Sequence, residues 1–163
     1  MSRWIATVFH VGRIGFAPGT FGSLAALPAG YLLHALGGFP TLALATGAVF
    51  LLGWWATANA TRGQQDHDPA EIVIDEVAGQ WIALWPLSAG LWWQGVDPWL
   101  FPWPGWVAAF MLFRGFDILK PWPVSRFDAM QTPLGVMLDD VMAGILAGIC
   151  GLALGLIAHG LFV

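Results

Sequence analysis

The chain has 163 residues, of which 58% are hydrophobic and only 10% are charged. A soluble domain of this size carries about a quarter charged residues, so the composition excludes an ordinary soluble enzyme and predicts an integral membrane protein. The formal net charge of −4 excludes the strongly basic surface that nucleic-acid binding requires, so no nucleic-acid partner is expected.

Five apolar segments approach the roughly 20 residues that a helix needs to cross a bilayer. In chain order they cover residues 20–37, 40–61, 79–95, 103–118 and 138–162. The sequence GGFP separates the first two segments, because paired glycines and a proline interrupt a helix. We therefore predict an all-α protein, a polytopic membrane bundle of about five transmembrane helices, in which residues 1–163 form one membrane-embedded domain.

Basic residues are distributed unevenly among the predicted loops. The loops at 37–40 and 95–104 contain neither Lys nor Arg. The six basic residues all lie before the first segment, after the second or around the end of the fourth, namely Arg3, Arg13, Arg62, Arg114, Lys120 and Arg126. Because Lys and Arg collect in cytoplasmic loops, the N-terminus is predicted to be cytoplasmic and the C-terminus to lie outside.

Two acidic pairs lie at the start of predicted helices on this same face. Asp75 and Glu76 enter the third segment, and Asp139 and Asp140 enter the fifth. A single pair would be explained as acids that stabilise a helix N-terminus through the macrodipole. Two equivalent pairs favour a shared site for a hard divalent cation, and Mg²⁺ suits oxygen ligands combined with a substrate phosphate.

The stretch FRGFDILKPWP, residues 113–123, adds cations beside these acids. Arg114, Asp117 and Lys120 follow one another at a spacing of three, so on a helix they share a face. One interpretation is a ladder of ion pairs at the membrane interface. The functional interpretation has Asp117 on the metal and Arg114 or Lys120 on a phosphate.

The stretch FAPGTFGSLAALP, residues 16–28, groups Gly, Ser and Thr where the first segment starts. One interpretation is helix capping by Thr20 or Ser23 after a Pro-Gly turn. A second interpretation adds to the first, because free N–H groups at a cytoplasmic helix N-terminus form a phosphate cradle. This stretch alone is a weak signal.

Three stretches together carry a family resemblance: APGTFGSLAALP, DPAEIVIDEVAGQWIAL, and FRGFDILKPWPVSRFD followed by GVMLDDVMAG. In this combination and order the chain resembles the phosphatidylglycerophosphatase A family. The resemblance implies a multi-pass, Mg²⁺-dependent phosphatase of the bacterial inner membrane, with its active site facing the cytoplasm. It implies a role in phospholipid biosynthesis, in which the enzyme removes the terminal phosphate of phosphatidylglycerophosphate and leaves phosphatidylglycerol. It also implies that the protein contacts membrane lipids.

The resemblance also implies roles for individual residues. The metal-binding acids carried over from the family's pattern are Asp68, Asp75, Glu76, Asp117, Asp139 and Asp140. The catalytic residues are Asp75, Glu76, Asp117, Asp139, Asp140 and Lys120. The residues that bind the substrate phosphate are Thr20, Gly22, Ser23, Arg114 and Lys120.

Two other classes of function compete with a phosphatase. In an ion- or proton-coupled transporter, intramembrane acids form a relay near the middle of the bilayer, on broken helices arranged as repeats. Here the acids fall at predicted helix ends on one side, and no repeat is visible. A non-catalytic lipid-binding subunit would not require so many clustered acids. The sequence leaves the oligomeric state and the number of metal ions open.

Overall fold

A computed structural model describes residues 1–64 and 69–161, with side chains as far as residue 158. No described residue belongs to a strand, so the all-α prediction is confirmed. In chain order the elements are α1 (Ser2–Ala6), the 3₁₀ helix η1 (Val11–Arg13), α2 (Pro18–Ala60), α3 (Ile74–Trp93), α4 (Trp103–Leu119), α5 (Val124–Asp128) and α6 (Pro133–Leu161).

Helix α2 contains both of the first two predicted segments. Its backbone leaves helical geometry at Gly37 and Gly38, so α2 consists of two helical halves on either side of a kink. Gly38 has a φ of 66°, a left-handed conformation that glycine adopts without a steric penalty. The predicted break at GGFP is therefore confirmed.

Helix α6 begins five residues earlier than the predicted start at 138. Pro133 occupies its first position, where a missing N–H is harmless, and the Gly135 amide donates to Thr132 Oγ1 at 3.0 Å. Asp139 and Asp140 consequently lie about two turns inside α6 rather than at its first residues, at 3.6 residues per turn. In contrast, Asp75 and Glu76 do lie in the first turn of α3, as predicted.

Two of the described helices are long and apolar enough to cross a membrane. They are α2 and the Pro133–Ala158 part of α6, whose most apolar stretches have mean hydropathies of 1.8 and 2.4. Helix α4, with 17 residues, is shorter than the roughly 20 that a span needs, and α3 opens with two acids and contains Gln80. Five membrane crossings therefore stay a prediction.

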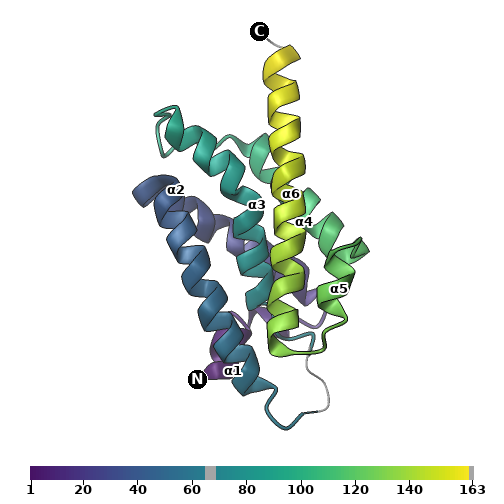
Figure 1. The fold of residues 1–163 in the computed structure, drawn as a ribbon. Helices are drawn as coiled ribbons and strands as arrows, with labels where there is room; N and C mark the ends of the chain where they lie inside the picture. Colours follow the sequence, from purple (N-terminus) through teal and green to yellow (C-terminus); the bar gives the residue numbers. More distant parts are fainter. Residues whose placement is uncertain (65–68, 162–163) are drawn as a thin grey trace.

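Helix α3 forms the centre of the bundle, between the second half of α2 and α6 (Figure 1). Its first three turns, residues 74–84, are buried apart from the half-buried Glu76. Two tryptophans attach α3 to α2, because Trp81 Nε1 donates to the Ala26 carbonyl at 2.8 Å and Trp85 Nε1 donates to Thr46 Oγ1 at 3.2 Å. These contacts hold the start of α3, and with it the first acidic pair, inside the bundle.

The backbones of α3 and α6 approach most closely at two glycines. A Cβ atom on Gly79 would lie 2.6 Å from the Asp140 carbonyl oxygen, and a Cβ atom on Gly144 would lie 3.1 Å from Gly79 Cα. One turn further along α6, a Cβ atom on Gly148 would lie 3.5 Å from the Ile82 carbonyl oxygen of α3. Small residues thus allow these two helices to pack at short range.

Candidate active site

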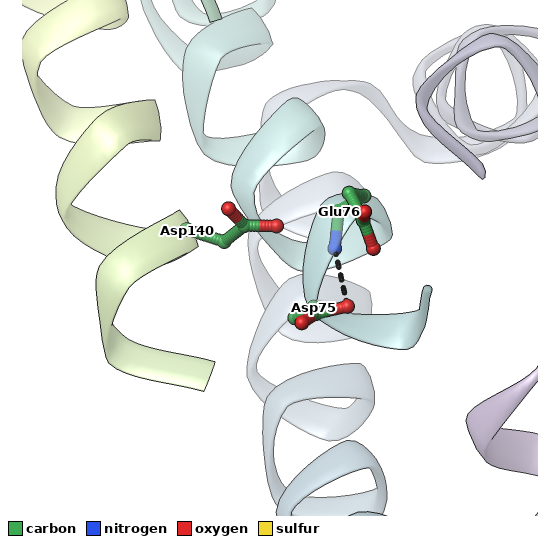
Figure 2. Close-up of side chains that lie close together, drawn as sticks. All are labelled: Asp75, Glu76 and Asp140. Carbon is green, nitrogen blue, oxygen red and sulfur yellow. Dashed lines mark hydrogen bonds between the residues drawn. The ribbon is translucent and has the colours of Figure 1, made fainter. Parts of the chain in front are cut away.

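Three carboxylates from two helices converge at one end of the bundle. Asp75 and Glu76 project from the first turn of α3, and Asp140 projects toward them from α6 (Figure 2). One carboxylate oxygen from each lies within 4.8 Å of the others. Asp75 and Asp140 are only 6% and 3% exposed, so the cluster is held inside the protein.

The glycine contact between α3 and α6 explains why these acids meet. Gly79 follows Asp75 by four residues, and Gly144 follows Asp140 by four residues. Residues four apart lie on the same helix face, one turn away from each other. The close approach at Gly79 and Gly144 therefore brings Asp75 and Asp140 together one turn nearer to the end of the bundle.

Part of the charge in this cluster is not satisfied by hydrogen bonds. The Glu76 amide donates to Asp75 Oδ1 at 3.1 Å, and the Asp140 amide donates to Asp139 Oδ1 at 3.0 Å. However, Glu76 Oε2 and Asp140 Oδ2 are buried and have no hydrogen-bond partner among the described residues. An unsatisfied buried polar group costs about 1–3 kcal/mol, and more when it is charged. Such a carboxylate is stabilised by a cation or by protonation.

Arg114 lies beside the acids on α4. Its Nη1 lies 2.5 Å from Asp117 Oδ2, so the predicted ion pair at a spacing of three is formed. The same nitrogen donates to Ser23 Oγ at 3.4 Å, which connects α4 to the start of α2. Arg114 Nε is buried and has no hydrogen-bond partner among the described residues.

Lys120 does not share a helix face with Asp117, contrary to the prediction from their spacing. Helix α4 ends before it because the next residue is Pro121, and Lys120 itself has a left-handed backbone conformation. Its Nζ instead donates to Asp139 Oδ2 at 3.0 Å and to Asp128 Oδ1. Burial lowers the pKa of Lys120, but the hydrogen bonds to Asp128 and Asp139 outweigh it and raise the pKa above its usual value.

These groups surround one cavity of about 350 Å³ at the end of the bundle that carries α1 and the starts of α3 and α6 (Figure 1). Its charged lining consists of Asp75, Glu76, Arg114, Asp117, Lys120, Asp139 and Asp140. Its non-polar lining consists of Ala17, Pro18, Gly19, Ala70, Ile72 and Ile118. The two acidic pairs and both predicted cations thus border the same space.

The first motif contributes to the cavity differently from the prediction. Thr20, Gly22 and Ser23 are not among the residues that line it. Neither hydroxyl caps α2, whose N-cap is Ala17, so the capping interpretation is wrong. The Ser23 hydroxyl is fully buried and donates to the Gly19 carbonyl at 2.9 Å, which leaves its oxygen to accept from Arg114. Asp68 lies outside the described residues.

The sequence does not single out two residues that lie at the site, Gly19 and Asp128. A Cβ atom on Gly19 would clash with Glu76 Oε1 and would lie 3.2 Å from Arg114 Nη1. The glycine lies inside the motif APGT, but nothing in the sequence says which side chains approach it. Asp128 reaches Lys120 only because α5 folds back after α4, which spacing along the chain does not indicate.

Gly19→Ala is expected to reduce activity because its methyl group displaces the Glu76 carboxylate and crowds Arg114. A misplacement of about 1 Å at a reacting group can lower the rate by about 10²-fold. Gly15→Ala is the matched control, since a Cβ atom there meets nothing within 4 Å. Initial rates of phosphate release by the two purified variants test this, and equal rates would contradict a close fit at Gly19.

A family model described as phosphatidylglycerophosphatase A matches residues 4–155. The chain belongs to the phosphatidylglycerophosphatase A family. Family membership confirms the resemblance seen in the sequence and the prediction that the protein is an enzyme, a phosphatase.

Curated relatives of the phosphatidylglycerophosphatase A family agree over most of the chain. The Haemophilus influenzae protein named phosphatidylglycerophosphatase A is 40% identical over 144 residues, which cover 88% of this chain and 82% of the relative. The Escherichia coli protein of the same name is 35% identical over 88% of this chain and 77% of its own. A Bacteroides thetaiotaomicron protein, provisionally named phosphatidylinositol-3-phosphatase, is 38% identical over 86% of this chain and 85% of its own. No solved structure gave a significant match.

Proposed function

We propose that this protein hydrolyses phosphatidylglycerophosphate to phosphatidylglycerol and phosphate and that it requires Mg²⁺. The observation that supports this is the convergence of acids and bases from α3, α4 and α6 on one cavity, in a chain whose relatives are named phosphatidylglycerophosphatase A. The reaction breaks the bond between phosphorus and the glycerol oxygen. Water supplies the fourth oxygen of the released phosphate and the proton that the glycerol oxygen takes up.

The donor set of the acidic cluster fits a hard divalent cation. Asp75, Glu76 and Asp140 offer only oxygen ligands, and two of their oxygens are buried without a hydrogen-bond partner among the described residues. Mg²⁺ is bound by a few carboxylates together with waters and substrate phosphates, so these three residues would hold it. When bound, the ion would neutralise phosphate charge and lower the pKa of a bound water.

The protein's own side chains divide the remaining work. Arg114 presents a planar guanidinium to the cavity, which suits two hydrogen bonds to a phosphate group. Asp117 and Ser23 orient this guanidinium, so Ser23 acts on the phosphate through Arg114. Asp139 and Asp128 hold the ammonium of Lys120 at the edge of the cavity, where its positive charge attracts an anionic head group.

We further propose that the chain crosses the bacterial inner membrane five times with the cavity on the cytoplasmic side. All six basic residues lie in or next to the N-terminal region, the α2–α3 connection, the end of α4 or α5, and the cavity lies among these segments. The positive-inside tendency then orients this end toward the cytoplasm. Topology reporters fused after Arg62 and after Arg126 are expected to read cytoplasmic, and finding them on opposite sides would contradict the five-span arrangement.

A related phosphomonoester lipid is a second candidate substrate. The Bacteroides thetaiotaomicron relative is named for a phosphatidylinositol phosphate and is as similar to this chain as the proteins named for phosphatidylglycerophosphate. Both lipids carry a phosphomonoester on a polyol head group, which a phosphodiester joins to diacylglycerol. The rates of hydrolysis of the two lipids therefore identify the preferred head group.

The decisive experiment measures phosphate release by purified, detergent-solubilised protein. We expect release from phosphatidylglycerophosphate, its loss on addition of EDTA, and its recovery when Mg²⁺ is added in excess. Phosphatidylinositol 3-phosphate is expected to react more slowly. No release from either lipid in the presence of Mg²⁺ would overturn the proposed activity, whereas release that persists in EDTA would overturn only the metal requirement.

A further inference from the structure

The cavity is too small for a whole phospholipid. Its volume of about 350 Å³ lies at the lower end of the range of about 300–1,000 Å³ for pockets that bury a drug-sized ligand. A phosphorylated glycerol head group fits this space. Each acyl chain, in contrast, extends through half of a hydrocarbon core about 30 Å thick. If the substrate is the proposed lipid, its chains leave the cavity across one part of the rim.

One part of the rim is apolar and open. Ile118 lines the cavity, and its side chain is nevertheless 67% exposed. Ile72, the other large aliphatic residue of the lining, is only 4% exposed and packs in the interior. Ile118 is therefore the large apolar side chain of the lining that borders both the cavity and the surface.

The surface of α4 continues this apolar edge away from the cavity. Val107 and Met111 are 50% and 62% exposed, and they precede Ile118 by eleven and seven residues, so the three share one helix face. Arg114 lies on the same face between Met111 and Ile118. The opposite face of α4 is buried in the core through Trp106, Ala109 and Phe113.

From this arrangement, and on the basis of the proposed function, we propose that the substrate's acyl chains cross the rim at Ile118 and lie along the Val107–Met111–Ile118 face of α4. One face of a single helix then contacts both parts of the lipid, because Arg114 binds the phosphate while the neighbouring side chains contact hydrocarbon. Ile118 becomes a specificity-determining residue that selects a phosphate attached to a diacyl lipid over the same phosphate on a water-soluble molecule.

The first test compares two substrates that differ only in their acyl chains, phosphatidylglycerophosphate and its deacylated form, glycerophosphoglycerophosphate. Ile118→Ser is expected to lower kcat/KM for the diacyl lipid about tenfold, the usual size of losing a small apolar contact to substrate. It should leave kcat/KM for the deacylated form unchanged. Leu119→Ser is the matched control, because Leu119 is 79% exposed at the same helix end but does not line the cavity. Equal losses on both substrates, or an equal loss in the control, would overturn the proposal.

A second test does not depend on turnover. Cys150 is the only cysteine of the chain, so Cys150→Ala provides a background for Ile118→Cys and, separately, Leu119→Cys. A non-hydrolysable diacyl phosphonate should slow maleimide labelling at position 118 at least tenfold and have little effect at position 119, and inorganic phosphate should protect neither. Protection at both positions, or at neither, would overturn the proposed acyl path. Absence of any hydrolysis by the wild type would instead overturn the proposed function.

Discussion

Asp140→Asn is expected to lower phosphate release by about 10²–10³-fold, the range observed when one group that stabilises transition-state charge is lost. Asp140 is 3% exposed, and its Oδ2 has no hydrogen-bond partner among the described residues. Asn keeps the volume of the side chain but removes the negative charge that a cation would require. The Mg²⁺ concentration that gives half-maximal activity should therefore rise together with the loss of rate.

Removing this charge should not unfold the protein. Asp140 lies within 4.8 Å of two other carboxylates, so neutralising it relieves repulsion in the cluster. Circular dichroism and size-exclusion chromatography in detergent are expected to match the wild type. Asp97→Asn is the control, because Asp97 is exposed and an amide oxygen at this position still accepts from the Trp99 amide. Near-normal turnover by Asp140→Asn would remove the basis for a metal at this cluster.

Arg114→Lys is expected to lower kcat/KM by a similar factor although the positive charge is kept. The guanidinium contacts Asp117 and Ser23 through Nη1, and Arg114 also lines the cavity. An ammonium group is a point charge that cannot reproduce this planar fork, so it pairs with Asp117 at the expense of the phosphate. Removing one donor to the transferring group costs about 10²–10³ in rate.

Steady-state kinetics on phosphatidylglycerophosphate would measure this effect. Arg126→Lys is the control, since Arg126 is exposed on α5 and does not line the cavity. If Arg114→Lys kept more than half of the wild-type kcat/KM, bidentate binding of phosphate by Arg114 would be wrong. The charge alone would then account for the contribution of this residue.

The helical architecture follows largely from local properties of the chain. Long apolar stretches favour helices, in which backbone groups are paired within the same segment, and the paired glycines at 37 and 38 interrupt α2 where the sequence indicates. Small residues such as Ala143, Gly144 and Ala147 recur at helical spacing, so the packing face of α6 is also visible in the sequence. The predicted start of α6 at 138 is wrong because it follows hydropathy alone, whereas Thr132 and Pro133 provide the initiation signals.

The composition of the candidate site also follows from the sequence, but its geometry does not. Two acidic pairs and the cations Arg114 and Lys120 are recognisable because charged residues are rare in this chain. The distance between the two acidic pairs depends on how closely α3 and α6 approach. Gly79 and Gly144 allow that close approach only because they face each other in the folded protein. In the same way, Lys120 follows α4 in a left-handed backbone conformation, and its side chain contacts Asp128 and Asp139 instead of Asp117. Local sequence therefore specifies helices and chemical groups, whereas contacts between residues distant in the chain decide which of these groups act together.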